Sequence, residues 1–107
     1  LTVKRAFDRV FREGVRSSCP MFTVLAAPND LGRPRLGLAV SRKTSRLATR
    51  RNRLKRLVRE SFRLSRGSLP DADLVVITKP PADAASVQDL RANLARHWHR
   101  VYRKCAG

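Results

Sequence analysis

The side chains of this sequence that could bind a ligand are mostly basic, and nearly half of them lie in one segment. Residues 42–66 contain eleven Lys and Arg residues and a single acid, Glu60. Arginine predominates, and its planar guanidinium donates paired hydrogen bonds to phosphate and stacks on nucleobases. The solvated face of an ordinary helix carries both signs of charge, which this segment does not. The segment therefore predicts a surface that binds a polyanion.

Apolar residues inside this segment recur at helical spacing. We expect a helix from Thr49, as its N-cap, to about Arg66, with Gly67 as its stop. One side of the helix would carry Leu54, Leu57, Val58, Ser61 and Phe62. The other side would carry a stripe of Arg51, Asn52, Lys55, Arg59, Arg63 and Arg66, widened by Arg53 and Arg56. The helix is thus expected to pack through one side and to present the other to a partner.

The acids and histidines form no recognisable catalytic or metal-binding set. The eight carboxylates are scattered singly, apart from Asp71 and Asp73, whose position before a strand is typical of turn and cap chemistry. Metal-dependent phosphodiester cleavage needs carboxylates clustered around the ions. His97 and His99 would diverge by about 200° on a helix, so they cannot share a proton or a ligand. We expect neither a catalytic residue nor a metal site.

Length and composition indicate one small polyanion-binding domain spanning residues 1–107. A chain of this length with 42% hydrophobic residues buries one modest core. Its formal net charge of +16 weakens the compact state unless a partner neutralises it. The longest apolar runs fall far short of the ~20 residues that a bilayer span needs. We expect Cys19 and Cys105 to be reduced thiols, and the charged N-terminal residues favour a cytoplasmic location over secretion.

The remaining pattern predicts the elements that position the basic helix. In chain order we expect a helix over 2–13, strands over 21–27 and 35–41, the basic helix, a strand over 73–78 and a helix over 86–101. A further short strand is expected near residues 15–17. The order is α-β-β-(β)-α-β-α. This is an α+β fold with a single small sheet of three to four strands packed with three helices.

The basic helix carries a motif that is similar to one in a known family. Arg51-Asn52-Arg53 followed by residues 54–63 (LKRLVRESFR) closely resembles the signature helix of the bacterial ribonuclease P protein subunit. The similarity continues in order through residues 7–14 (FDRVFREG), 35–43 (RLGLAVSRK) and 69–78. It covers nearly the whole chain, which is therefore identified as a member of that family.

The resemblance implies that the protein assists catalysis by an RNA. In the family, a catalytic RNA removes the 5′ leader from precursor tRNA using bound Mg²⁺, and the protein binds this RNA and the leader. RNase P RNA and precursor tRNA are the implied partners, with one protein monomer per RNA and Mg²⁺ held mainly by the RNA. We expect no membrane partner and no small-molecule substrate. The implied fold is ribosomal-protein-like, with a left-handed βαβ crossover around the signature helix.

The resemblance also implies two groups of site residues. Contact with the RNA subunit is expected from Arg51, Asn52, Lys55 and Arg59, together with Arg53 and Arg56, and we extend this surface to the basic residues Arg42, Lys43, Arg46, Arg50 and Arg63. The leader is expected in a groove between the first helix and the sheet, at Phe7, Phe11, Thr23 and Leu25. Of the two aromatic residues, Phe11 is the one for which core packing is the stronger alternative. Some members have an aromatic residue where this chain has Leu25, so one stacking platform is absent here.

Other functions remain open from the sequence alone. A structural RNA-binding protein, ribosomal or chaperone-like, would share the charge and the fold but would not restore precursor-tRNA processing to a catalytic RNA at low Mg²⁺. A DNA-binding regulator would need a helix-turn-helix or a dimer seam, and neither is evident. A stand-alone nuclease would cleave RNA without a catalytic RNA. A membrane-surface helix is disfavoured because the apolar side of the basic helix is expected to pack on the sheet.

Overall fold

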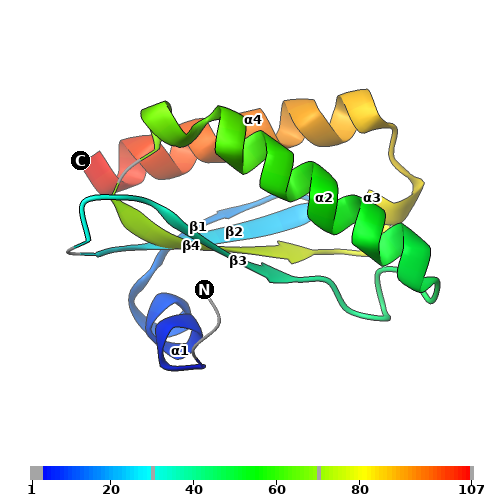
Figure 1. Ribbon diagram of the computed structural model, residues 1–107, viewed down its shortest axis with the longest axis horizontal. Helices are drawn as coiled ribbons and strands as arrows, with labels where there is room; N and C mark the ends of the chain where they lie inside the picture. The colour runs from blue at the N-terminus through cyan, green and yellow to red at the C-terminus, as the bar shows by residue number, and fades with distance from the viewer. Residues whose placement is uncertain (1–3, 30, 70, 107) are drawn as a thin grey trace.

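Four strands form one mixed sheet, and helices cover both of its faces (Figure 1). The computed structural model describes residues 4–29, 31–69 and 71–106. In chain order the elements are α1 (Lys4–Glu13), β1 (Val15–Ser18), β2 (Phe22–Pro28), β3 (Arg35–Ala39), α2 (Ala48–Leu64), the 3₁₀ turn η1 (Arg66–Ser68), β4 (Ala72–Thr78), α3 (Pro81–Ala84) and α4 (Val87–Ala106). The expected α+β class is confirmed, and the short strand expected near residues 15–17 is present as β1.

The strand order β1-β2-β4-β3 places the two strands that flank α2 side by side. β1, β2 and β4 pair antiparallel, whereas β3 pairs parallel with β4, with Leu36 opposite Leu74 and Leu38 opposite Val76. A parallel pair needs a crossover connection, and α2 supplies it. In Figure 1, β3 lies in front of β4, both strands point to the right, and α2 passes above them from the first strand to the second, which makes the crossover left-handed. Most such crossovers are right-handed, so the expectation taken from the family is confirmed where the general rule would have failed.

The main core lies between the sheet and the layer formed by α2, α3 and α4. Its buried apolar side chains include Phe22, Val24, Ala26, Leu54, Leu57, Val58, Leu69, Ala72, Leu74, Val76, Ala82, Leu90, Leu94, Trp98 and Val101. Those from the strands occupy alternate positions, because successive residues of a strand point to opposite faces. Leu36, Leu38 and Val40 pack against the same core. Because α2 buries one side here, its charged side is turned outward.

α1 covers part of the opposite face of the sheet. A second apolar cluster there contains Val10 of α1, Leu25 and Ala27 of β2 and Val75 of β4. A Cβ on Gly14 would lie 2.4 Å from the carbonyl oxygen of Val10, in the last turn of α1, and 3.0 Å from that of Ala26 in β2. Gly14 directly follows the end of α1, and its lack of a side chain permits the close packing of α1 on the sheet.

Three details differ from the sequence-based expectations. The helical layer contains a further short helix, α3, which begins at Pro81, because proline is well suited to the first turn of a helix. α2 begins at Ala48 after Leu47, so Thr49 lies inside the helix and is not its cap. The basic helix also ends earlier, at Leu64, and Arg66 lies in η1.

α4 is capped at its start by Ser86. The Oγ of Ser86 accepts a hydrogen bond from the backbone N–H of Asp89 at 3.1 Å, which satisfies one donor of the first turn. Among the described residues, no helix has the length and hydropathy that crossing a membrane requires.

Candidate nucleic-acid interface

α2 separates into a buried side and a basic side, as the helical spacing predicts. Leu54, Leu57 and Val58 are buried against the sheet and α4. The predicted RNA-contact residues Asn52, Arg53, Arg56, Arg59 and Arg63 are exposed, whereas Arg51 and Lys55 are half-buried. The structure thus gathers the basic stripe on one accessible side of a helix that is fixed by its packing.

A hollow of about 580 Å³ lies between α2 and the edge strand β3. Its walls carry Lys55 and Arg59 from α2, Arg66 from η1, Arg35 at the start of β3 and Arg33 in the loop before it, with Phe62 among them. The basic stripe expected from the sequence contained three of these cations, Lys55, Arg59 and Arg66, and only Lys55 and Arg59 were among the expected RNA contacts. Arg33 was missed because it precedes β3 in a turn-rich loop, and only the parallel pairing of β3 brings it beside α2.

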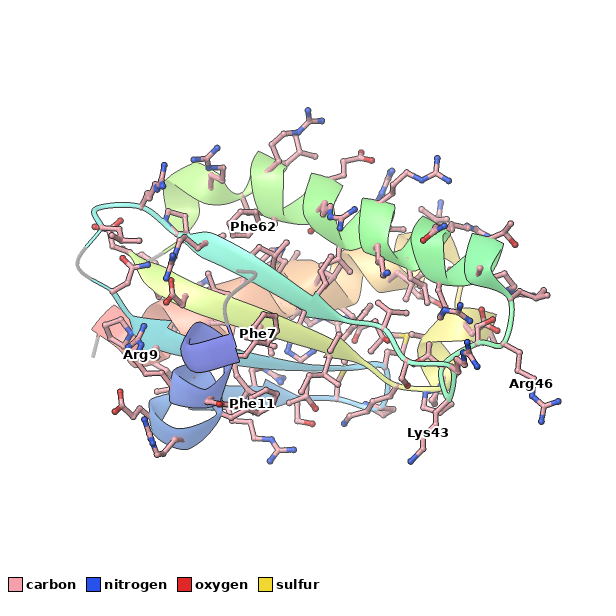
Figure 2. All side chains as sticks on the ribbon, turned by 60° about the horizontal axis from the view of Figure 1, so that its bottom comes forward. Phe7, Arg9, Phe11, Lys43, Arg46 and Phe62 are labelled. Atoms are coloured by element: carbon pink, nitrogen blue, oxygen red, sulfur yellow. The ribbon has the colours of Figure 1, made fainter. Side chains whose placement is uncertain are left out.

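A second hollow, of about 890 Å³, lies at the N-terminal end of α2. It brings together four predicted RNA-contact residues, Arg42, Lys43, Arg46 and Arg51. The loop between β3 and α2 is fixed there, because Nη1 of Arg51 donates to the carbonyl oxygens of Ser45 and Arg46 at 2.9 and 3.0 Å. Figure 2 shows Lys43 and Arg46 pointing outward at this end of the molecule. Asp83, which pairs with Arg50, also lines this hollow. The four cations outnumber this acid, so the hollow can take phosphate groups.

Arg50 differs from its neighbours in the predicted RNA-contact set. Its Nε lies 2.8 Å from Oδ1 of Asp83, and its Nη2 donates to the carbonyl oxygen of the same residue at 2.8 Å. These contacts join α2 to α3. The acid neutralises part of the charge that Arg50 would offer to RNA, so its first role in the free protein is to hold the helical layer together.

The predicted leader-groove residues lie on the opposite face of the sheet, with α1. Phe7 is half-buried and packs against the cluster of Val10 and Leu25, whereas Phe11 is 52% exposed. The expectation that Phe11 would be the better packed of the two is therefore wrong. Thr23 and Leu25 are buried in β2, with Thr23 Oγ1 3.1 Å from Ser18 Oγ. Figure 2 shows the two phenylalanines on one side of α1, over the sheet. Phe11 thus offers the open ring, and Leu25 forms part of the floor.

A buried carboxylate holds α1 in this position. Asp73 of β4 is 1% exposed, and Oδ1 accepts hydrogen bonds from Arg35 Nε at 2.7 Å and Asn29 Nδ2 at 2.9 Å. Oδ2 accepts from Arg35 Nη2 at 2.8 Å and from Arg9 Nη2, on α1, at 2.9 Å. The hydrogen bond from Arg35 holds the pKa of Asp73 far below its usual range, with Asn29 and Arg9 adding to the effect, although burial opposes it.

The expectation that Asp73 serves turn chemistry is therefore wrong. The register of the sheet explains this, because Arg35 lies directly opposite Asp73 on the parallel neighbour strand. Two residues that form an ion pair across strands, and that lie far apart in the sequence, cannot be identified as partners unless that register is known. Asp73 thus joins α1 to the sheet, a role that sequence reasoning missed.

His97 occupies a second polar cluster, away from the basic surface. It is buried, with Nδ1 2.7 Å from Ser17 Oγ and Nε2 3.1 Å from Cys19 Sγ. Burial, reinforced by the positive charges of Arg100 and Lys79, lowers the pKa of His97 to about 4, so the ring is neutral at pH 7. These contacts join α4 to β1. In the part of the chain that the structure describes, no three His, Cys, Asp or Glu side chains gather where they could hold a metal ion.

The comparisons with known proteins agree with this geometry. The sequence matches the family described as Ribonuclease P over residues 1–102. It is 50% identical over 101 residues to the Ribonuclease P protein component of Methylococcus capsulatus, covering 94% of this chain and 79% of that protein. Among solved structures, it is similar to the RNase P protein from Thermotoga maritima in complex with 1-(4-fluorophenyl)-2-thiourea. The two structures give a TM-score of 0.86 at 37% sequence identity, and the match covers 94% of this chain and 98% of that one.

A second solved structure, that of the Staphylococcus aureus RNase P protein, gives a TM-score of 0.84 at 26% identity and covers 94% of this chain and 92% of that one. The residues matched by the family, 1–102, include α2 and the loop before it. The chain belongs to the ribonuclease P protein component family.

Proposed function

We propose that this chain is the RNA-binding subunit of ribonuclease P, which binds RNase P RNA through α2 and the 5′ leader of precursor tRNA over α1. Its family makes it a subunit of a nuclease complex with RNase P RNA as the implied partner. In the proposal the RNA carries out phosphodiester hydrolysis, and the protein positions the two RNAs. We further propose one protein monomer per RNA and a cytoplasmic location.

The observation that carries the proposal is the pair of cation-lined hollows along one side of α2. Lys55 and Arg59 line the first and Arg51 the second. None of the ion pairs formed by the described residues involves these three side chains. A charge that is not neutralised within the protein is available to phosphate, and binding then releases counterions from the RNA. This supports assignment of the RNA subunit to α2.

The face formed by α1 and the sheet has a different chemistry, which suits a single strand. Phe11 offers a ring that is half exposed, beside the exposed Arg12 and Arg16. Single-stranded RNA is bound by basic surfaces with aromatic platforms, and each stacked base contributes about 1–3 kcal/mol. The two RNAs would therefore occupy opposite faces of the sheet, and the protein would hold the leader in a fixed position relative to the RNA subunit.

The described residues do not fit a Mg²⁺ site. Hard cations need several oxygen ligands at one point, and the carboxylates of Asp73, Asp83 and Glu60 each pair with arginine instead. We therefore assign Mg²⁺ to the RNA and derive no step through it. The protein supplies positive charge, which reduces the repulsion between the phosphates of the RNA subunit and those of the precursor tRNA as the two RNAs approach each other.

Reconstitution tests the proposal. A bacterial RNase P RNA and a precursor tRNA are incubated at a Mg²⁺ concentration at which the RNA alone cleaves slowly, with and without the purified chain. We expect the chain to restore release of the 5′ leader, and the chain without RNA to release none. A chain that binds the RNA but leaves its cleavage rate unchanged would refute the proposal and favour a purely structural RNA-binding protein.

A further inference from the structure

A third hollow lies on the other side of the C-terminal end of α2, where η1 meets α4. Its volume is about 550 Å³, and it is lined by Ser65, Gly67, Ala95, Trp98, His99 and Tyr102. It is separated from the hollow beside β3 by an aromatic pair, Phe62 and Trp98, whose ring centroids lie 6.2 Å apart. Neither the α2 surface nor the α1 face accounts for it.

The lining of this hollow combines one open ring with small side chains. Tyr102 is 46% exposed, and Trp98 is buried, with its Nε1 donating to Ser61 Oγ at 2.9 Å. Ser65, Gly67 and Ala95 leave room beside the ring of Tyr102. A Cβ built on Gly67 would meet no heavy atom of the described chain within 4 Å. The hollow is therefore wide enough for a planar group beside an aromatic ring, and it is not filled by the protein itself.

The two chain segments that line the hollow are basic, and the acid that adjoins them, Glu60, pairs with Arg91. Residues 61–70 and 90–107 contain no Asp or Glu. The basic residues of these two segments are Arg63, Arg66, Arg91, Arg96, Arg100, Arg103 and Lys104. A second copy of a chain with net charge +16 would bring like charges together here. The charge instead complements a polyanion, and a polyanion that carries planar aromatic groups is a nucleic acid.

We propose that this hollow binds one unpaired nucleobase of the RNA held by α2, stacked on Tyr102, with its flanking phosphates on the neighbouring arginines. Bases that are looped out of structured RNA are commonly read by stacking on aromatic side chains. The hollow adjoins the end of α2, so an RNA that follows the basic side of this helix passes beside it. The inference rests on the proposed function, because the occupant belongs to that RNA.

Binding of a folded bacterial RNase P RNA to Tyr102→Ala and Tyr102→Phe variants tests the inference. Loss of one stacked base reduces affinity about 5- to 150-fold, which corresponds to about 1–3 kcal/mol. We expect this loss in Tyr102→Ala and near wild-type affinity in Tyr102→Phe, which keeps the ring. The slope of log K against log salt should stay unchanged in both, because stacking releases no counterions. Leu31→Ala, which removes an apolar side chain that is 51% exposed and lines none of these hollows, is the matched control.

A variant that fills the hollow tests the same site without removing a contact. Gly67 lies in η1, and among the described glycines only Gly32 has a φ that disfavours a side chain. Gly67→Leu should therefore fold with the melting temperature of the wild type and bind the RNA as weakly as Tyr102→Ala.

The outcomes separate this inference from the proposed function. Wild-type affinity in both Tyr102→Ala and Gly67→Leu overturns the nucleobase site and leaves the α2 surface intact. A concentration-dependent dimer that Tyr102→Ala abolishes would also overturn it, because the hollow would then join two copies of the chain. Failure of the wild-type protein itself to bind the RNA would overturn the proposed function, and the nucleobase site with it.

Discussion

Replacing Asp73 with Asn should loosen α1 from the sheet and weaken leader binding. The carboxylate is 1% exposed and accepts four hydrogen bonds from three residues, Arg9, Arg35 and Asn29. An uncharged amide cannot satisfy both guanidinium groups. Breaking a fully buried ion pair costs about 3–5 kcal/mol, but the side chains of Arg9 and Arg35 are 31% and 37% exposed and can regain water. We therefore expect a loss of about 2–3 kcal/mol in the free energy of unfolding.

Urea denaturation at pH 7 measures the loss, and Asp83→Asn provides the control. The ion pair of Asp83 with Arg50 is more exposed, at 25% and 46% for the two side chains, and exposed pairs contribute about 0–1 kcal/mol. Affinities measured in parallel should separate the two RNA surfaces. Asp73→Asn should bind precursor tRNA more weakly in the reconstituted complex, because α1 carries Phe11, while its affinity for the RNA subunit alone stays near wild type.

Acid pH should act on the same ion pairs. The pKa of Asp73 is lowered in the folded state, so its contribution to stability is fully present above the unfolded value near 4 and is lost as the pH falls further. Equal stability losses in Asp73→Asn and Asp83→Asn would refute the reasoning. So would an Asp73→Asn variant whose affinity for precursor tRNA is unchanged, since α1 would then not depend on this carboxylate.

Three further predictions concern single residues. The pKa of His97 is about 4 in the folded protein and about 6.5 when unfolded, so unfolding takes up a proton between these pH values. The free energy of unfolding should therefore fall by up to about 3 kcal/mol as the pH drops from 6.5 to 4. Urea denaturation at several pH values should show a weaker pH dependence in His97→Gln, and the same pH dependence as in the wild type would contradict the assignment. Gly14→Ala should lower the melting temperature by several degrees because its Cβ would meet backbone oxygens, whereas Gly67→Ala should change it little; equal effects in a thermal scan would count against the close packing of α1. Phe11→Ala should reduce the affinity for precursor tRNA about 5-fold or more and change the melting temperature by no more than about a degree or two. Phe11→Leu should recover little of the lost affinity, because only a ring stacks on a base. Full recovery of affinity in Phe11→Leu would show a purely apolar contact instead.

The fold was largely predictable from the sequence because its elements carry strong local signals. The apolar residues of α2 recur at helical spacing, and those of β3 alternate as in a strand. β4 is apolar on both of its faces, as in a strand that is covered on both sides. Each of these patterns indicates its element without help from the rest of the chain. Boundaries depend on weaker effects, and Leu47 takes the cap position that Thr49 was expected to fill. The short α3 was missed because adjacent prolines end a strand as readily as they begin a helix.

The candidate site was predictable only where it lies on one element. Lys55 and Arg59 could be placed together because they are a single helical turn apart. Arg33 joins them through strand pairing, and Asp73 meets Arg9 and Arg35 across the sheet, which local sequence does not encode. The relative burial of Phe7 and Phe11 likewise depends on how α1 is oriented on the sheet. Helical spacing alone does not determine how the helix is rotated about its own axis.

The salt dependence of affinity for a bacterial RNase P RNA tests the central claim about α2 most directly. Lys55→Ala/Arg59→Ala removes two cations of the hollow beside β3, and Arg12→Ala/Arg16→Ala removes two exposed cations that lie off α2, beside Phe11. Each lost phosphate contact should make the slope of log K against log salt less steep by about 0.7–0.9. We predict a change of about 1.5 in the α2 variant and little change in the control. Equal slopes in the two double variants would contradict the assignment of the RNA subunit to this surface.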